Sequence, residues 1–190
     1  METKNIMIVG VGGQGTLLAS KLLGAALLKM NYDVKVSEVH GMSQRGGSVV
    51  TNVKYSDKVY SPIVDKGEAD IILAFEMLEA YRALPYLKIG GHIIANTQEI
   101  NPMPVNNGAA TYPKDIDKKL SKVANTTFVD AASLAKEAGN IKAVNVVLLG
   151  VMAKKMDIAY DKWIEVIKST VPAKLLDVNL KAFELGYNSK

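Results

Sequence analysis

The chain contains no cysteine and only two histidines, His40 and His92, among its 190 residues. Without cysteine, this chain has no disulfide, no thiolate zinc site and no cysteine-bound iron–sulfur cluster of its own. Two histidines that lie far apart in the sequence also give little material for a histidine-built metal site. We therefore predict that this chain carries no metal ligands and no catalytic residue of these kinds.

Arginine is equally scarce, because Arg45 and Arg82 are the only two. The remaining basic residues are lysines interspersed with acidic residues, and the formal net charge is +4. Nucleic-acid-binding domains instead concentrate lysine and arginine on one face. We interpret the modest positive charge as a contribution to solubility and predict no nucleic-acid partner.

Long hydrophobic runs are also missing. The most apolar stretch, Thr16–Leu28, is interrupted by Ser20 and Lys21 and is shorter than the roughly 20 residues that a membrane-spanning helix needs. The first residues lead directly into an apolar run without the basic segment of an export signal. We expect a cytoplasmic protein without a membrane partner, and the 48% hydrophobic content predicts one packed domain over residues 1–190.

Strand-like and helix-like segments alternate along the first two thirds of the chain, and helical patterns dominate the rest. The predicted strands are Lys4–Val9, Asp33–Val39, Ser48–Tyr55, Ala69–Ala74, His92–Asn96 and Thr126–Val129. The predicted helices are Thr16–Met30, Glu76–Leu84, Ala132–Ala138, Ala143–Met156, Asp161–Thr170 and Pro172–Leu185. The stretch Ile100–Pro113 is predicted to be an irregular loop.

This alternation predicts an α/β, Rossmann-like three-layer fold with a mostly parallel sheet and a helical C-terminal part. A turn at Asp57-Lys58 would return the third strand through Val59-Tyr60 as a β-hairpin insertion. The helix Thr16–Met30 is hydrophobic around most of its circumference, so it must be covered on more than one side. Either the C-terminal helices of this chain or a second subunit would supply the additional cover.

A first glycine-rich loop, Gly10-Val-Gly-Gly-Gln-Gly15, lies between a predicted strand and a predicted helix. It fits the G-x-G-x-x-G pattern, whose glycines let a ligand approach the backbone while the helix N-terminus attracts an anion. Glu38, near the end of the second strand, would suit a ribose of a dinucleotide. Alternatively, the glycines only make a tight turn. The candidate binding residues are Gly10, Gly12, Gly13, Gln14 and Gly15.

A second glycine-rich loop follows the second strand and contains one of the two arginines. Its candidate binding residues are Ser43, Gln44, Arg45, Gly46 and Gly47. The Arg45 guanidinium could hold a phosphate or carboxylate, with the neighbouring amides completing the cradle. Alternatively, Arg45 pairs with an acid of another chain and the glycines allow two backbones to pack closely. His40, just before the loop, is a weaker candidate for proton transfer.

The two loops together resemble the gamma-type module of the 2-oxoacid:ferredoxin oxidoreductases, and most of all the beta subunits that act on indolepyruvate and other arylpyruvates. The resemblance includes the first loop and continues through Ser37–Ser48 to later segments of the chain in the same order. These later segments are Gly67–Asp70, Leu73–Glu76, Leu84–Lys88, Gly139-Asn140, Asn145–Gly150 and Asn179–Phe183. The Ser-Gln-Arg-Gly-Gly sequence of the second loop is more specific than a single glycine motif.

The resemblance implies a subunit of an enzyme that decarboxylates aryl 2-oxo acids oxidatively, using coenzyme A and ferredoxin. An alpha subunit would carry thiamine diphosphate, magnesium and the [4Fe-4S] clusters, in an alpha2beta2 assembly. This chain would bind none of these cofactors alone and would contact coenzyme A through its glycine-rich loops. Within the same family, the alternative is the gamma subunit of another 2-oxoacid:ferredoxin oxidoreductase that acts on pyruvate or 2-oxoglutarate. Two functions outside the family stay open from the residues alone: a stand-alone NAD or flavin enzyme, and a ligand-sensing or scaffold domain.

Overall fold

The computed structural model describes residues 2–40 and 46–189. Its centre is one sheet with the strand order β2-β3-β1-β4-β5-β6. The strands are β1 (Lys4–Val11), β2 (Asp33–His40), β3 (Ser48–Ser56), β4 (Ala69–Ala74), β5 (Leu87–Asn96) and β6 (Asn125–Val129). Strands β1, β4, β5 and β6 pair in parallel, whereas β3 is antiparallel to both β1 and β2. The prediction of a mostly parallel α/β fold is confirmed.

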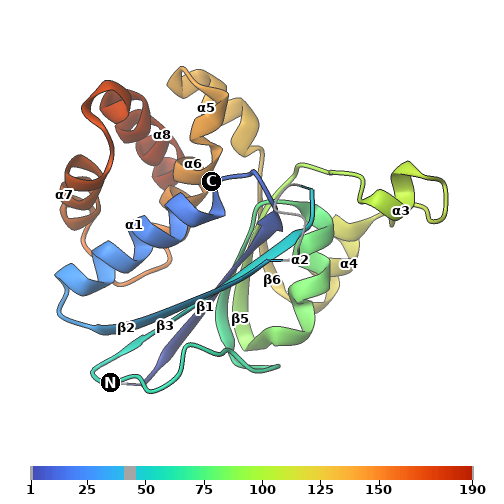
Figure 1. Ribbon diagram of the computed structural model, residues 1–190, viewed down its shortest axis with the longest axis horizontal. Coiled ribbons are helices and arrows are strands. Elements are labelled where there is room, and N and C mark those ends of the chain that lie inside the picture. Colours follow the sequence, from blue (N-terminus) through green and yellow to red (C-terminus); the bar gives the residue numbers. More distant parts are fainter. Residues whose placement is uncertain (1, 41–45, 190) are drawn as a thin grey trace.

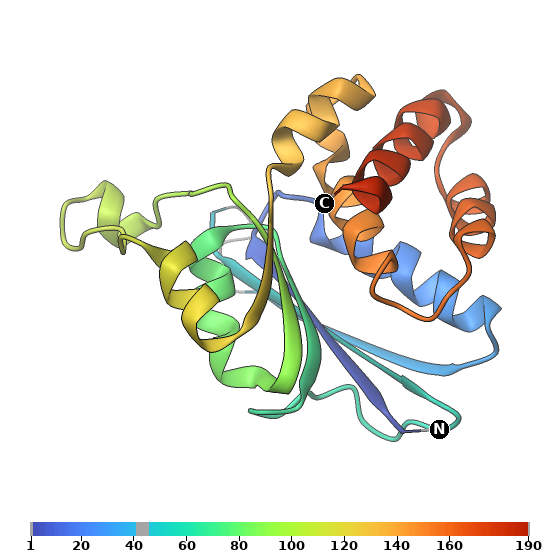
Figure 2. The same cartoon turned by 180° about the vertical axis from the view of Figure 1, so that it is seen from behind.

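Helices cover both faces of this sheet (Figure 1). They are α1 (Thr16–Lys29), α2 (Met77–Ala83), α3 (Met103–Asn106), α4 (Ile116–Val123), α5 (Ala131–Ala138), α6 (Val144–Ala153), α7 (Tyr160–Thr170) and α8 (Leu176–Asn188). Helix α1 and helices α5–α8 lie on one face, while α2 and α4 lie on the other (Figures 1 and 2). The result is three layers, with a helical C-terminal part as predicted.

Successive residues of β1 point to opposite faces of the sheet and therefore enter two different cores. Ile6 and Ile8 pack with α1 and the C-terminal helices, whereas Met7 and Val9 pack with α2 and α4. Because both faces are covered, the central strands are apolar in nearly every position rather than alternating.

The predicted β-hairpin insertion at Val59-Tyr60 is wrong, since neither residue belongs to a strand. The Val59 N–H donates instead to the Asp33 carboxylate (2.9 Å), which holds this segment against the start of β2. The antiparallel hairpin of the sheet is formed by β2 and β3.

Two helices differ from the sequence-based expectation. The predicted irregular loop Ile100–Pro113 contains the short helix α3, and α4 was not predicted. Helix α4 buries Ile116 and Leu120, whose spacing of four residues places them on one face of a helix.

Helix α1 is covered mainly by this chain itself. Leu22, Leu23 and Leu27 are fully buried in the core that α1 shares with the C-terminal helices. Leu17 and Leu28 remain 65% and 60% exposed. The C-terminal helices therefore provide most of the additional cover that the apolar sequence of α1 requires.

Candidate functional site

The two glycine-rich loops meet at the carboxyl edge of the sheet. Gly10 at the end of β1 pairs with Val49 of β3, and His40 at the end of β2 pairs with the same Val49. The Gly12 N–H donates to the Gly47 carbonyl (2.8 Å), and the Gly46 N–H donates to the Gly12 carbonyl (3.3 Å). Ser43, Gln44 and Arg45 lie outside the described residues.

Gln14 holds the first loop in place. Its Oε1 accepts from the Val11 N–H (2.7 Å), and its Nε2 donates to the Phe75 carbonyl (3.0 Å) and to Gln98 Oε1 (3.1 Å). The side chain thereby connects the loop to the ends of β4 and β5. Gln14 was predicted to bind a ligand, and these bonds show that its side chain also braces the loop.

Two glycines of this loop have a backbone conformation that favours glycine. Gly15 has φ +85°, and a Cβ there would lie 2.8 Å from Nδ2 of Asn145, which donates to the Gly15 carbonyl. Gly13 has φ +104°, but a Cβ there would meet no atom within 4 Å. Gly15 thus permits close packing against α6, whereas Gly13 faces open space.

A cavity of about 410 Å³ lies beside these glycines. It is lined by Gly12, Gly13, Gly15, Thr16, Leu17, Glu38, His40 and Val49. The first turn of α1 contains no acidic residue, and its N-cap, Gly15, provides no side-chain cap. The positive end of the α1 dipole is therefore available to an anion in the cavity.

Glu38 contributes a carboxylate to the same cavity and accepts a hydrogen bond from Thr51 Oγ1 (3.3 Å). The cavity thus combines a site that favours an anion with an acceptor for ligand hydroxyl groups. His40 also lines it, and its role in proton transfer remains a prediction.

Two buried acids beside this edge were missed by the sequence analysis. Glu76 is 1% exposed and caps α2, where its Oε2 accepts from the Glu79 N–H (2.8 Å). Glu79 is also buried, accepts from Ser48 Oγ (2.5 Å) and pairs with Arg82 (2.6 Å). For Glu76, the available signal was its position just after an apolar strand, where a helix begins and an N-cap is needed.

Tyr112 connects Glu76 to the loop after β5. Its hydroxyl donates to Glu76 Oε1 (2.5 Å) and accepts from the Leu78 N–H (3.1 Å), and the Ile100 N–H donates to the same Glu76 oxygen (3.0 Å). Burial and the hydrogen bond to Glu76 raise the pKa of Tyr112, so the hydroxyl keeps its proton and remains a donor at neutral pH.

We predict that Tyr112→Phe lowers the free energy of unfolding by about 1–3 kcal/mol, because a buried carboxylate and a backbone N–H both lose a partner. Chemical denaturation measures this change. Tyr81→Phe is the matched control, since among the described residues the Tyr81 hydroxyl makes no hydrogen bond, and its effect should be under about 0.5 kcal/mol. Equal effects of the two variants would show that the Tyr112 bonds are unimportant.

Comparison with known proteins identifies the family. Residues 5–189 match the family described as pyruvate ferredoxin/flavodoxin oxidoreductase. The chain belongs to this family. It is 47% identical to the indolepyruvate oxidoreductase subunit IorB of Pyrococcus horikoshii, over 98% of this chain and 95% of that protein. The corresponding subunit of Thermococcus kodakarensis is 46% identical over 98% of this chain and 95% of its own length.

Solved structures of family members have the same fold. The gamma subunit of a keto/oxoacid ferredoxin oxidoreductase from Geobacter sulfurreducens superposes with a TM-score of 0.72 at 24% identity, covering 97% of this chain and 96% of that one. Pyruvate oxidoreductase subunit PORC from Thermotoga maritima gives 0.77 at 19%, covering 100% and 97%. The resemblance seen in the sequence is therefore confirmed. Among the described residues, no helix has the length and apolar character to cross a membrane.

Proposed function

We propose that this chain is the beta subunit of an indolepyruvate ferredoxin oxidoreductase, which converts aryl 2-oxo acids and coenzyme A to aryl-acetyl-CoA and carbon dioxide while reducing ferredoxin. The main support for this proposal is the sequence identity of 37–47% to indolepyruvate oxidoreductase subunits over nearly the whole chain. The common gamma subunits of pyruvate/ketoisovalerate oxidoreductases, the second candidate, are only 26–29% identical.

The ligands that this chain can offer support a division of labour between two subunits. It has no cysteine for an iron–sulfur cluster, and no group of three His, Asp or Glu suitable for a metal ion occurs among residues 2–40 and 46–189. We assign thiamine diphosphate, magnesium and the [4Fe-4S] clusters to the alpha subunit of a cytoplasmic alpha2beta2 complex. These groups supply carbanion and electron-transfer chemistry, and the beta subunit supplies binding surface and backbone amides.

Coenzyme A is the ligand that we assign to the cavity of the glycine-rich loops. The open Gly13 backbone and the acid-free first turn of α1 suit a phosphate group, and Arg45 would add a charged partner. A 2-oxoglutarate:ferredoxin oxidoreductase from Magnetococcus marinus is described with coenzyme A bound, and this chain matches 31% of that protein.

A stand-alone dinucleotide-binding protein is the alternative that the cavity itself favours, because Glu38 would suit a ribose. Calorimetry of the isolated chain with NAD decides this point. Micromolar binding of NAD without a second subunit would support the alternative and contradict our proposal.

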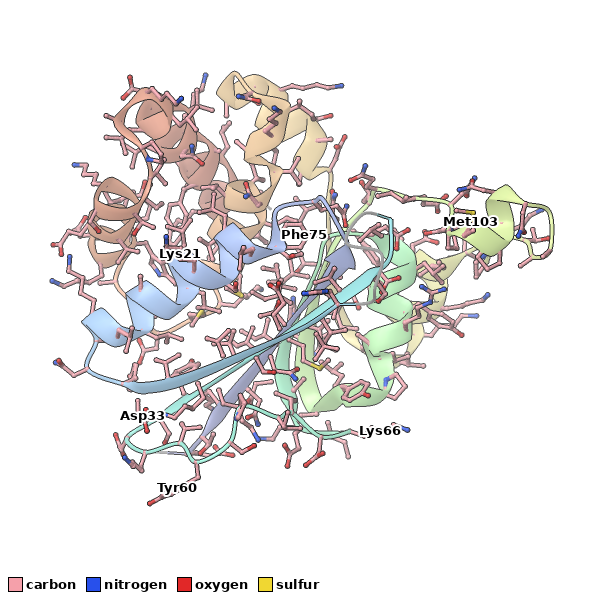
Figure 3. All side chains as sticks on the ribbon, viewed as in Figure 1. Lys21, Asp33, Tyr60, Lys66, Phe75 and Met103 are labelled. Carbon is pink, nitrogen blue, oxygen red and sulfur yellow. The ribbon has the colours of Figure 1, made fainter. Side chains whose placement is uncertain are left out.

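A projecting arm, residues 100–113, supports the dependence on a second subunit. It contains no charged residue, and it extends beyond α2 and α4, with Met103 at the start of its short helix α3 (Figures 1 and 3). Its base is fixed by the bonds of Ile100 and Tyr112 to Glu76, and Met103 is 72% exposed. An uncharged arm anchored at its base is suited to insertion into a partner, because no charged group has to be desolvated on binding.

We therefore expect Met103→Glu to weaken association with the alpha subunit at least tenfold, since binding would bury an unpaired carboxylate. Co-purification of the tagged beta subunit with co-expressed alpha subunit tests whether the two subunits associate. Measurement of the affinity then tests whether the arm makes the contact. Ile89→Glu is the control because Ile89 is fully exposed elsewhere, at the start of β5. If the wild-type protein fails to bind the alpha subunit, the proposed function is wrong. If the wild-type protein and Met103→Glu bind the alpha subunit equally well, the arm is not the contact.

A further inference from the structure

A second cavity lies on the other face of the sheet, between β3, β1 and α2. Its volume is about 310 Å³, at the lower end of the range of small-molecule sites. Most of its wall is apolar and is formed by Met7, Val9, Val39, Val50, Ile63, Val64 and Ala83, and Tyr86 adds an aromatic ring with a hydroxyl group. None of the described glycine-loop residues lines it, so it is separate from the site described above.

One buried polar side chain in this apolar wall has no hydrogen-bond partner. Asn52 of β3 lines the cavity and is 7% exposed. Its Oδ1 is buried without a partner, and its amide makes no hydrogen bond to any residue in the described part of the chain. A buried amide oxygen without a donor is destabilising by about 1–3 kcal/mol, and such groups call for an explanation when they occur beside a cavity.

The charged groups at this cavity are already paired, whereas the Tyr86 hydroxyl, which also lines it, makes no hydrogen bond within the described part of the chain. Glu79 accepts from Ser48 and Arg82, so the charge of its carboxylate is balanced at the rim. The Asn52 amide is therefore the buried polar group whose hydrogen bonds a bound molecule could complete, while the Tyr86 hydroxyl is only half-buried. A primary amide offers a donor, its NH2 group, beside an acceptor, its oxygen. A matching ligand therefore has, on one edge, an acceptor for the NH2 group beside an N–H or O–H donor for the oxygen.

We propose that this cavity binds a flat, largely apolar heteroaromatic ring whose one polar edge pairs with the amide of Asn52. The apolar walls would desolvate the faces of the ring, and the amide would select rings with an N–H beside an acceptor. Because Oδ1 is covered in the ligand-free protein, binding includes a rotation of the amide about its χ2 torsion, which is a soft torsion in asparagine. This inference does not depend on the proposed function.

Two fused-ring probes of similar shape test the proposal on the full chain. 7-Azaindole has an N–H beside a pyridine nitrogen, whereas benzothiophene has neither. We expect NMR titration to show both binding, and Asn52→Leu to weaken 7-azaindole about tenfold relative to benzothiophene. Val39→Trp, at the exposed rim, should abolish binding of both by filling the entrance. Absence of binding, or an equal effect of Asn52→Leu on both probes, would overturn the proposal.

Stability provides an independent readout without ligand. Asn52→Leu should raise the melting temperature, because it removes a buried amide oxygen that has no hydrogen-bond donor. Asn179→Leu is the matched control: Asn179 is also 7% exposed, but its Nδ2 donates to the Leu175 carbonyl at 2.7 Å, so its replacement should lower the melting temperature. A loss of stability in Asn52→Leu comparable to that in Asn179→Leu would contradict the proposal, since it would mean that the Asn52 amide is already satisfied.

Discussion

Gly186→Ala is expected to lower the free energy of unfolding by about 3 kcal/mol or more, because α6 and α8 cross with their backbones in direct contact. A Cβ on Gly186 would overlap the Val147 carbonyl, and a Cβ on Gly150 would overlap the Phe183 carbonyl. Backbone atoms within two helices cannot move aside as a flexible side chain can. The helices must therefore separate, which disturbs the fully buried Phe183 and Trp163 beside them.

Gly24→Ala provides the control for this substitution, since Gly24 also lies within a helix, α1. A Cβ there would meet nothing within 4 Å, so the higher helix propensity of alanine should stabilise the protein by about 0.5–1 kcal/mol. Urea denaturation of both variants measures the contrast. Similar stability of the two variants would show that the α6–α8 crossing is not as close as described.

Gly13→Asp is expected to raise the KM for coenzyme A at least tenfold in the assembled enzyme, with little change in kcat. The new carboxylate would stand in the cavity at the N-terminus of α1 and repel the phosphate that we assign there. A higher KM with an unchanged kcat indicates the loss of a contact that stabilises the bound substrate and the transition state equally.

Gly13→Asn separates charge from backbone strain in this experiment. Both side chains have nearly the same shape, and both residues tolerate positive φ better than most, so the strain at φ +104° is shared. Only aspartate adds a charge. Equal KM values for the two variants would show that no phosphate lies beside Gly13, and they would leave the subunit assignment untouched.

The fold could be predicted from the sequence where one local pattern decides the outcome. The apolar runs of β1, β4 and β5 predict parallel strands covered on both faces, and the glycine-rich loop predicts the β1–α1 turn. The antiparallel direction of β3 relative to β2 could also be predicted from the length of the connection between them. Residues 41–47 are too few for the crossover that a parallel neighbour would need. The period-two pattern of β3 does not by itself say which strand is its partner.

The hydrogen bonds that hold the candidate site in place could not be predicted, because they join residues far apart in the sequence. Asn145 reaches the Gly15 carbonyl across 130 positions, and Gln14 reaches Phe75 and Gln98 across 61 and 84. Nor does a sequence pattern reveal that Val59 binds Asp33 rather than forming a hairpin. The candidate residues of the first loop could be found from their glycines, whereas the groups that position them required the structure.

Turnover by separated and recombined subunits addresses the central claim most directly. Reduction of ferredoxin is followed with indolepyruvate and coenzyme A, using this chain alone, the alpha subunit alone and the two together. We predict no turnover by this chain alone and full activity only after recombination. Ferredoxin reduction by this chain without the alpha subunit would contradict the claim that its partner holds the electron-carrying groups.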